Sequence, residues 1–330
     1  MDKAFILAPM AELSHRALRE LIGKFGGCDS YFTEMISASA LVGGGPFEAW
    51  YIDNGPEPEK LVYQLVGAEI PQIVKAAAIL DRLECAGIDL NMGCCAPLIR
   101  KSGAGIAWMA SIDKAGELVK QVRKTVKHRL SVKLRIGFQD DFDYLVRFCS
   151  RLEAEGVEFI TLHPRMADEK LKRRARWEYV GKLRQELGIP VAGNGDIAAP
   201  GDLIRRVSEP CDAVMAGRGA VQQPWIFAAT RNIQAGQNPV KVDIEETGLC
   251  FLELLSRWQP QEFHISRARR FFAFFCDNLK WGNYLKNLLN REETLSGIEK
   301  AWRSYFAEQR ETGNEELGVR NVLIEKYQNM

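Results

Sequence analysis

The chain has 330 residues, of which 26% are charged and 46% hydrophobic, and its formal net charge is +1 at pH 7. The small net charge excludes a global attraction to nucleic acid, so any such binding must come from a local basic patch. No apolar run approaches the roughly 20 residues of a membrane span, and the N-terminus reads as a first core strand rather than a signal peptide.

Short apolar or β-branched runs alternate with longer amphipathic ones. Eight runs are predicted as strands: 4–8, 30–34, 61–66, 87–91, 130–135, 158–163, 189–194 and 211–216. Helices are expected at 14–24, 71–85, 113–127, 141–155, 177–187 and 199–207. Strands separated by helices indicate parallel βαβ units. Eight such units favour an α/β fold, a (β/α)8 TIM barrel, with a doubly wound open sheet as the structural alternative.

After about residue 240 the pattern is helical to the end of the chain. Phe251, Leu254 and Leu255 recur at the i, i+3, i+4 spacing of an amphipathic helix. We therefore expect a barrel domain over 1–240 and a separate all-helical domain over 241–330.

Polar or otherwise special residues stand where the predicted strands end, which is where a barrel carries its functional groups. These residues are Pro9, Met10, Glu34, Gln64, Asn91, Cys94, His163, Arg165, Asn194, Gly195, Asp196, Gly217 and Arg218. One of them would mean little, but a ring over seven or eight strands predicts a site at this end of the barrel.

Lys133 and Arg135 are two residues apart on one predicted strand, so their side chains point to the same face. A lysine inside a packed barrel is costly unless it meets an anionic group. One interpretation is a salt bridge to a neighbouring carboxylate such as Glu34. The other is a cation that faces the anionic edge of a bound cofactor.

Two glycine-rich turns, "AGNGD" and "MAGRGA", end the last two predicted strands. Glycines there let backbone N–H groups approach a phosphate, and barrels often bind phosphates in these loops. The alternative is that both are simply tight turns. His163 has no acid or serine nearby in sequence, so it is either a ligand contact or a satisfied core histidine.

Two basic stretches, "KLKRRARW" (170–177) and "RARRFFAFF" (267–275), stand out from the neutral background. Each is either a solvated face or a clamp for a phosphate backbone. The candidate RNA-binding residues in them are Lys172, Arg173, Arg174, Arg267 and Arg270.

The eight cysteines contain no CxxC pair and no regular framework. That favours reduced thiols in the cytoplasm over a disulfide scaffold. With four histidines and no HExxH or Cys/His cluster, we expect no metal site. We also expect a monomer that does not bind membranes.

With these residues in view, the chain resembles the tRNA-dihydrouridine synthase family from about residue 4 to 330. The motifs that carry the resemblance are "LAPMA" 7–11, "FTEM" 32–35, "YQLVG" 63–67, "DLNMGC" 89–94, "VKLRIGF" 132–138, "LHPR" 162–165, "IPVAGNGDI" 189–197 and "DAVMAGRGAVQQPWIF" 212–227. They occur in the family's order and spacing, and the family's fold is a barrel with an appended helical domain.

The resemblance implies bound FMN, NADPH as the electron source, and reduction of the 5,6 double bond of a uridine in tRNA. It places Pro9, Met10 and Ala11 under the flavin, Gln64 and Lys133 on its ring, and His163 near it. The implied phosphate ligands are Asn194, Gly195, Asp196, Gly217 and Arg218. Asn91 is implied beside the substrate, and Arg135 and Arg165 join the basic stretches as RNA-binding candidates.

Cys94 matches the family's catalytic cysteine, which donates a proton as a general acid. Cys95 stands where the family normally has proline, either as a structural replacement, a vicinal disulfide partner or a second acid. "HPR" also departs from the family, which usually has a small residue before the arginine. Two other functions stay open: a flavin oxidoreductase acting on a small molecule, and an RNA-binding protein that retains FMN.

Overall fold

The computed structural model describes residues 3–169 and 173–311. The chain divides into two compact units. The barrel unit contains Met1–Ser14 and Cys28–Gly217, and the helical unit contains His15–Gly27 and Arg218–Met330. The helical unit therefore takes its first helix from the N-terminal part of the sequence.

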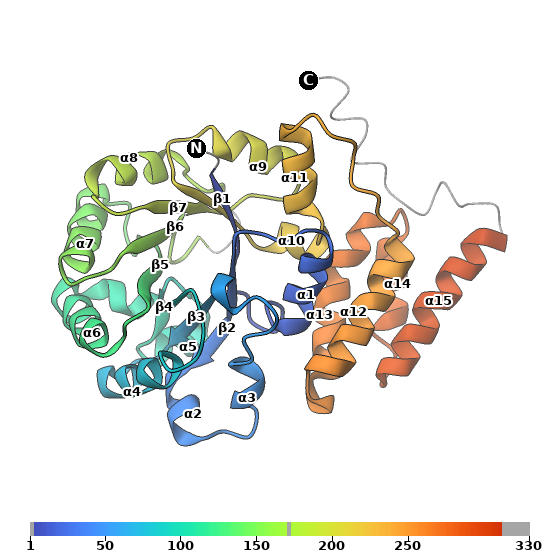
Figure 1. Cartoon of the computed structure of the whole chain (residues 1–330), viewed down its shortest axis with the longest axis horizontal. Coiled ribbons are helices and arrows are strands. Elements are labelled where there is room, and N and C mark those ends of the chain that lie inside the picture. The colour runs from blue at the N-terminus through green and yellow to red at the C-terminus, as the bar shows by residue number, and fades with distance from the viewer. Residues whose placement is uncertain (1–2, 170–172, 312–330) are drawn as a thin grey trace. The chain divides into compact units, whose positions relative to one another are not determined.

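Eight parallel strands close into a barrel in the order β1 to β8 (Figure 1). Their bounds are β1 Ala4–Leu7, β2 Ser30–Ser37, β3 Leu61–Val66, β4 Gly87–Met92, β5 Arg129–Gly137, β6 Phe159–Met166, β7 Val191–Asn194 and β8 Ala213–Ala216. The closing pair is β1 with β8, where Phe5 aligns with Val214 and Leu7 with Ala216. This confirms the predicted TIM barrel and rules out the open sheet.

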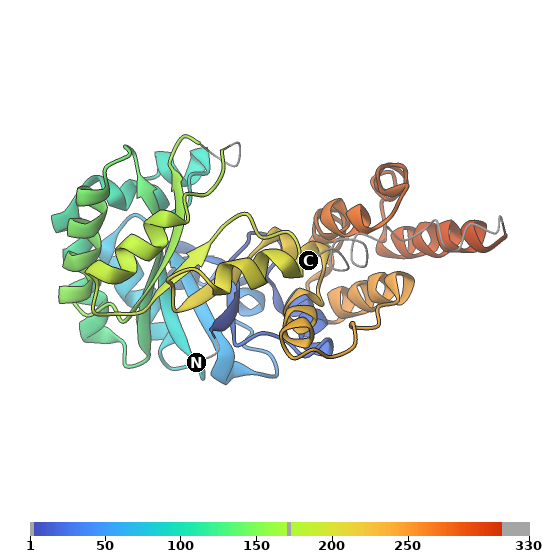
Figure 2. The same cartoon turned by 90° about the horizontal axis from the view of Figure 1, so that it is seen from above.

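Amphipathic helices cover the outside of the strands (Figure 2). The longer ones are α4 Ile70–Leu80, α6 Ile112–Thr125, α7 Phe142–Ala154, α8 Glu178–Glu186 and α9 Pro200–Val207. Shorter segments are α2 Ala38–Gly43, α3 Glu48–Tyr51, α5 Pro97–Lys101, and the 3-10 turns η1 Pro58–Lys60 and η2 Gly105–Ala110. The Ser111 and Asp141 side chains cap α6 and α7 by accepting from Lys114 N and Tyr144 N.

The interior of the barrel has two layers, because residues two apart on a strand face the same side. One group of inward side chains forms an apolar layer: Ile6, Ala8, Phe32, Val62, Phe159, Ala192, Ala213 and Met215. The register then aligns Gln64 with Asp89, Asp89 with Ser131, and Asn91 with Lys133. On β3, β4 and β5, the inward positions nearer the carboxyl ends are therefore polar, and this polar layer contains the predicted site residues Gln64, Asn91 and Lys133.

The helical unit is built from α1 Arg16–Lys24, α10 Arg218–Gln222, α11 Ile226–Gln234, α12 Ile244–Trp258, α13 His264–Phe275, α14 Gly282–Leu289 and α15 Leu295–Glu311, with the 3-10 turns η3 Gln261–Phe263 and η4 Cys276–Asn278. Its core is aromatic: Phe251 stacks on Phe271 with ring centroids 3.7 Å apart. Helix α1 joins α12, since Arg16 lies over the Trp258 ring and Trp258 Nε1 donates to Glu20 Oε2 at 3.0 Å.

No helix within residues 3–169 and 173–311 combines the length and apolar character needed to cross a membrane. All eight cysteines are present as free thiols.

Candidate active site

A buried carboxylate, Asp89, lies at the centre of the polar layer. It is 0% exposed and accepts two hydrogen bonds, from Ser131 Oγ and Gln64 Nε2, both at 2.7 Å. Burial raises the pKa of Asp89 to about 6, and the two hydrogen bonds and the Lys133 charge partly oppose that shift. Asp89 was not among the predicted site residues. The feature of the sequence that could have revealed it is a charged residue two positions before Asn91 in an otherwise apolar strand.

Hydrogen bonds continue from Gln64 to the loop that carries Cys94. Gln64 Oε1 accepts from Asn91 Nδ2 at 2.8 Å. Asn91 Oδ1 in turn accepts from the backbone N–H of Cys94 at 2.9 Å and of Gly93 at 3.2 Å. The predicted site residues Gln64, Asn91 and Cys94 therefore belong to one connected network.

The Cys94 loop is also fixed from its other side. The Cys94 carbonyl accepts from Ile106 N at 3.0 Å. Gly105 makes this possible: its φ is +60°, and a Cβ there would lie 2.6 Å from the Cys94 carbonyl oxygen. Cys94 and Cys95 are both half-buried, and Pro97 opens α5 immediately after them.

Lys133 points into the same layer and lies next to Asn91 in the strand register. Burial lowers the pKa of Lys133 to about 8, with the Arg135 charge adding to the shift and Asp89, Cys94 and Cys95 opposing it. Among the described residues its ammonium forms no hydrogen bond or ion pair, so the suggested salt bridge to Glu34 is not formed. One Glu34 oxygen accepts from Glu12 N at 2.6 Å.

A second cluster surrounds His163 and Arg165 on β6. Arg165 is 2% exposed; its Nε donates to Arg173 O at 2.6 Å, and its Nη1 lies 2.9 Å from His163 Nε2. It also forms an ion pair with Asp196. Since a guanidinium only donates, His163 Nε2 accepts this bond. Arg165 was predicted to bind RNA, but here its side chain is inside the barrel unit and orients His163 and Asp196.

The turn after β7 lies against this cluster. Gly195 has φ +124°, and a Cβ there would lie 3.0 Å from His163 Cδ2 and Ala175 Cβ. The side chains of its neighbours stabilise the turn: Asn194 Nδ2 donates to Met215 O at 2.7 Å, and Asp196 Oδ2 accepts from Ala175 N at 2.6 Å. The Asp196 carboxylate is therefore paired with Arg165, and phosphate binding by this turn stays a prediction.

The ends of β1 and β8 also meet at this side of the barrel. A Cβ on Gly217 would lie 3.3 Å from Met10 Sδ, so a larger residue there would require the Met10 side chain to shift. Pro9 and Met10 are half-buried and Ala11 is exposed. Arg218 is exposed and begins α10 in the helical unit. Its role in phosphate binding stays a prediction.

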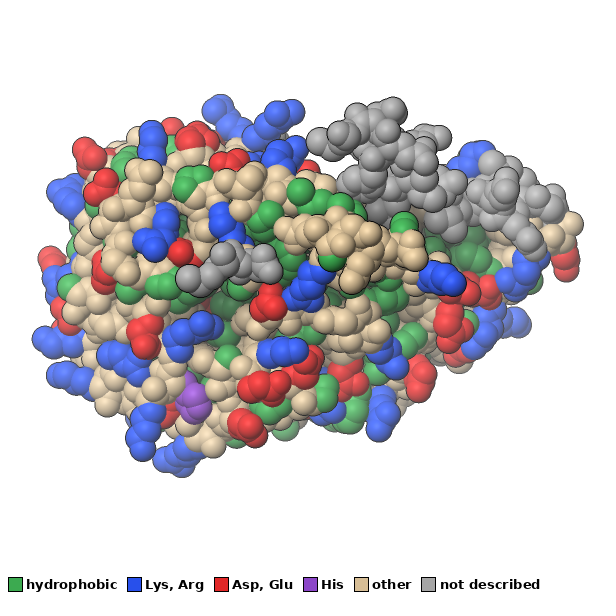
Figure 3. Space-filling model, turned by 45° about the horizontal axis from the view of Figure 1, so that its top comes forward, with side chains coloured by type: hydrophobic (Ala, Val, Ile, Leu, Met, Phe, Trp, Pro, Cys, Tyr) green, Lys and Arg blue, Asp and Glu red, His purple; other side chains and the backbone are tan. Residues whose placement is uncertain are grey.

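The basic stretches are less available than their sequence suggests. Arg173 and Arg174 are exposed, but Arg176 forms an ion pair with Glu169, and Lys172 lies outside the described residues. The face shown in Figure 3 carries Lys and Arg interspersed with Asp and Glu rather than a patch of one sign.

In the helical unit, Arg270 is exposed, but Arg267 is 2% exposed and donates to Gln259 Oε1. The structure therefore does not offer Arg267 as a surface group for RNA. Arg135, on β5, is half-buried and its Nη1 donates to Met166 O at 3.1 Å.

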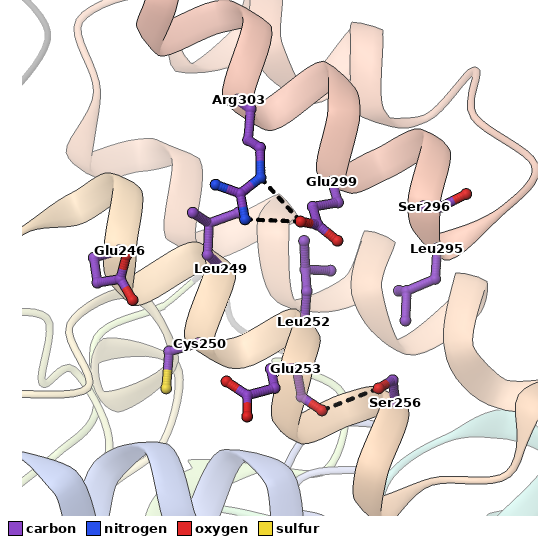
Figure 4. Close-up of a pocket in the computed structure, with 10 residues that line it drawn as sticks. All are labelled: Glu246, Leu249, Cys250, Leu252, Glu253, Ser256, Leu295, Ser296, Glu299 and Arg303. Atoms are coloured by element: carbon purple, nitrogen blue, oxygen red, sulfur yellow. Dashed lines mark hydrogen bonds and ion pairs between the residues drawn. The ribbon is translucent and has the colours of Figure 1, made fainter.

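A pocket of about 550 Å³ lies within the helical unit, between α12 and α15 (Figure 4). Leu249, Leu252 and Leu295 contribute apolar lining, and Glu246, Glu253 and Glu299 contribute carboxylates. Its arginine, Arg303, forms an ion pair with Glu299 at 2.8 Å. An acidic lining disfavours a phosphate backbone. In addition, no group of three or more His, Cys, Asp or Glu side chains in the described ranges could hold a metal ion.

Comparison with known proteins shows the family to which the chain belongs. Residues 6–315 match the family model described as dihydrouridine synthase. The chain belongs to the dihydrouridine synthase family. This confirms the predicted family and, with it, the predicted enzyme class, a flavin-dependent oxidoreductase that forms dihydrouridine.

Several relatives of this dihydrouridine synthase family member are similar over most of their length. A probable tRNA-dihydrouridine synthase of Aquifex aeolicus is 30% identical over 90% of this chain and 95% of its own. The tRNA-dihydrouridine synthase B of Pseudomonas aeruginosa is 26% identical over 95% and 96%. The tRNA-dihydrouridine(16) synthase of Neisseria meningitidis is 30% identical over 92% and 93%.

Among solved structures, the chain is similar to a 2-naphthoyl-CoA reductase in complex with 2-naphthoyl-CoA. The TM-score is 0.53 at 10% identity, over 71% of this chain and 50% of that one. This similarity supports the barrel fold alone.

Proposed function

We propose that this protein reduces the 5,6 double bond of a uridine in tRNA, with FMN as its cofactor and NADPH as the reductant. The observation that carries the proposal is the juxtaposition of the fixed Cys94 loop, Asn91 and the Lys133 ammonium, which has no partner in the described part of the chain, at the carboxyl ends of β4 and β5. Family membership and the names of the relatives support the substrate.

The residues of the polar layer fit a flavin. Lys133 is a partly buried cation without an anionic partner among the described residues, and such a group suits the electron-rich edge of the ring. After its bonds to Asp89 and Asn91, Gln64 retains one N–H and one lone pair for the ring. Pro9, Met10, Ala11 and His163 would complete the ring site, and the turns at Asn194–Asp196 and Gly217 would hold the phosphate.

When bound, FMN supplies the hydride that reduces carbon 6 of the uracil. The protein supplies the proton: the Cys94 thiol donates it to carbon 5, so that one hydride and one proton saturate the double bond. Lys133 stabilises negative charge near the ring while it remains protonated. The uridine must leave its stack to reach this depth, which favours a base in a loop of folded RNA.

The remainder of the tRNA needs a broader surface. We assign it to the segment 241–330, predicted as an all-helical domain, with the exposed Arg270, and to the exposed Arg173 and Arg174 of the barrel unit. The free thiols fit a reducing cytoplasm, and we propose that the protein acts there as a monomer.

The dihydrouridine content of tRNA from cells with and without the gene tests the proposal. We expect one or more positions to revert to uridine in the deletion strain, and the Cys94→Ala gene to fail to restore them. An unchanged dihydrouridine map would defeat the proposal and favour a flavin oxidoreductase with a small-molecule substrate. Restoration by Cys94→Ala would instead favour an RNA-binding role.

A further inference from the structure

We propose that Asp89 is a positioning residue that orients the Cys94 loop through the side chains of Gln64 and Asn91. The inference deepens the proposed function, because it rests on Cys94 as the proton donor. Asp89 does not reach the loop itself; three hydrogen-bonded steps connect its carboxylate to the Cys94 backbone.

The first step fixes the orientation of Gln64. An ionised carboxylate only accepts hydrogen bonds, so the group that faces Asp89 Oδ2 at 2.7 Å must be the Gln64 NH2. Ser131 Oγ occupies the other carboxylate oxygen at the same distance. Gln64 is 0% exposed, so water cannot substitute for either partner.

The second step fixes the orientation of the Asn91 side-chain amide. With its NH2 turned to Asp89, Gln64 presents Oε1 to Asn91. Asn91 Nδ2 must therefore donate to this oxygen, and the two atoms are 2.8 Å apart. Asn91 is then left with Oδ1 facing the loop. The opposite amide orientation would place two NH2 groups against each other.

The third step holds the backbone that carries the thiol. Asn91 Oδ1 accepts from both Cys94 N and Gly93 N, at 2.9 and 3.2 Å. Were Asn91 flipped, its NH2 would face two N–H donors and both bonds would be lost. The acceptor-only chemistry of Asp89 therefore decides whether the loop amides are bound.

The presence of a carboxylate here also needs a reason beyond packing. A fully buried carboxylate lowers the free energy of unfolding through its desolvation, and an apolar side chain of similar size at this interior position would not. The neighbouring inward positions one layer below are indeed apolar, with Val62 preceding Gln64 by two residues.

The test compares Asp89→Leu with Asp89→Asn. Leucine cannot accept a hydrogen bond from Gln64, so it no longer fixes the orientation of the Gln64 amide. Asparagine can, because its Oδ1 can accept from Gln64 while its NH2 donates to the Ser131 hydroxyl. We expect Asp89→Leu to lower kcat for dihydrouridine formation by about 10- to 100-fold, with the KM for tRNA changed less than about threefold. Asp89→Asn should restore kcat to within about threefold of wild type.

A second readout needs no tRNA. Hydrogen exchange of the Gly93 and Cys94 amides, and the alkylation rate of Cys94 followed by peptide mass spectrometry, are measured on the full chain loaded with FMN. Asp89→Leu should accelerate amide exchange by at least about tenfold and change the alkylation rate, and Asp89→Asn should leave both unchanged.

Asp81→Leu is the matched control. Asp81 also accepts several hydrogen bonds, from Lys127 N and His128 N at 2.8 and 3.0 Å and from the His128 ring. These residues precede the amino ends of β4 and β5, away from the Cys94 loop. Its loss should lower stability without altering exchange at Gly93 and Cys94.

Wild-type exchange and kcat in Asp89→Leu would overturn the proposal, as would equal defects in Asp89→Asn and Asp89→Leu. Should Asp89→Leu fail to fold, Asn91→Ala decides with the exchange readout, because slow Gly93 and Cys94 amides in that variant would exclude the last step. If wild-type protein makes no dihydrouridine while the exchange results hold, the proposed function fails and the positioning role stands.

Discussion

The two interior layers of the barrel come from the same strands yet follow different rules. The apolar layer, which includes Phe32 and Met215, is filled by side chains that only need to fit. The polar layer contains Asp89 and Gln64, which are as buried as the apolar side chains, and the half-buried Lys133. The apolar layer stabilises the fold. The polar layer lowers that stability, because it fixes polar groups where a ligand can bind.

This difference between the two layers predicts which substitutions affect stability and which affect chemistry. Side chains of the apolar layer make no directional bonds, so their replacement changes the free energy of unfolding. Members of the polar layer depend on one another through hydrogen-bond direction, so their replacement changes what the site binds and transfers. The following predictions test that separation.

Cys94→Ala should have the largest effect. Removal of a general acid costs about 10²- to 10⁴-fold in rate, so dihydrouridine formation measured by mass spectrometry should fall by that factor. Reduction of bound FMN by NADPH, followed by absorbance, should stay within about twofold, because that step does not need the proton donor.

Cys250→Ala, which removes a thiol of α12 in the helical unit, is the control and should retain full turnover. A Cys94→Ala protein with wild-type turnover would show that the thiol does not donate the proton.

Phe32→Ala should act on the other layer. Phe32 is 1% exposed, and removal of a buried phenylalanine side chain costs about 3–5 kcal/mol of unfolding free energy through lost burial and a residual cavity. Denaturant titration measures the loss. In the protein that remains folded, FMN affinity should change less than about threefold; a large loss of affinity at intact stability would contradict the separation of the layers.

FMN affinity should depend on pH through Lys133. With its pKa lowered to about 8, this lysine is mostly an ammonium near pH 7 and mostly neutral near pH 9. Affinity should therefore fall by up to about tenfold over that interval, as measured by flavin fluorescence quenching.

Lys133→Met should bind FMN more weakly and show no such fall. Parallel pH profiles in wild type and Lys133→Met would show that the ammonium does not contact the cofactor.

Cys95→Pro should have the smallest effect. Cys95 stands where the family normally has proline, and the bonds that hold Cys94 run through Asn91 and Ile106 rather than through Cys95. A compatible proline stabilises by up to about 1 kcal/mol, and kcat should stay within about threefold. Thermal melting and turnover check both; a tenfold loss of turnover would assign the Cys95 thiol a part in the reaction.

Much of this fold could be predicted from hydrophobic pattern, because a parallel barrel strand is short, apolar and followed by a helix. The eight predicted strands are all present, and β2, β5 and β6 extend further than predicted, to Ser37, Gly137 and Met166. The partner of α1 could not be predicted, because an amphipathic face shows that a helix is buried and not against which helix it packs.

Within the site, the residues brought together at β3, β4 and β5 were predicted from their place at strand ends. Asp89 was missed because a buried carboxylate can be recognised only from its partners, Ser131 and Gln64, which come from other strands. Arg165 was predicted as an RNA-binding residue from its place at the end of a strand, and Arg267 from the basic stretch 267–275, although both side chains are buried. Their carbonyl, carboxylate and amide partners, which make burial possible, are visible only in three dimensions.

Reconstitution with purified protein tests the proposed reaction directly. Unmodified tRNA, FMN and NADPH are incubated with the full chain, and the tRNA nucleosides are then analysed by mass spectrometry. We predict that a defined uridine gains the mass of two hydrogens, with one NADPH oxidised for each uridine reduced. Oxidation of NADPH by a flavin-loaded protein that leaves every uridine unchanged would contradict the account.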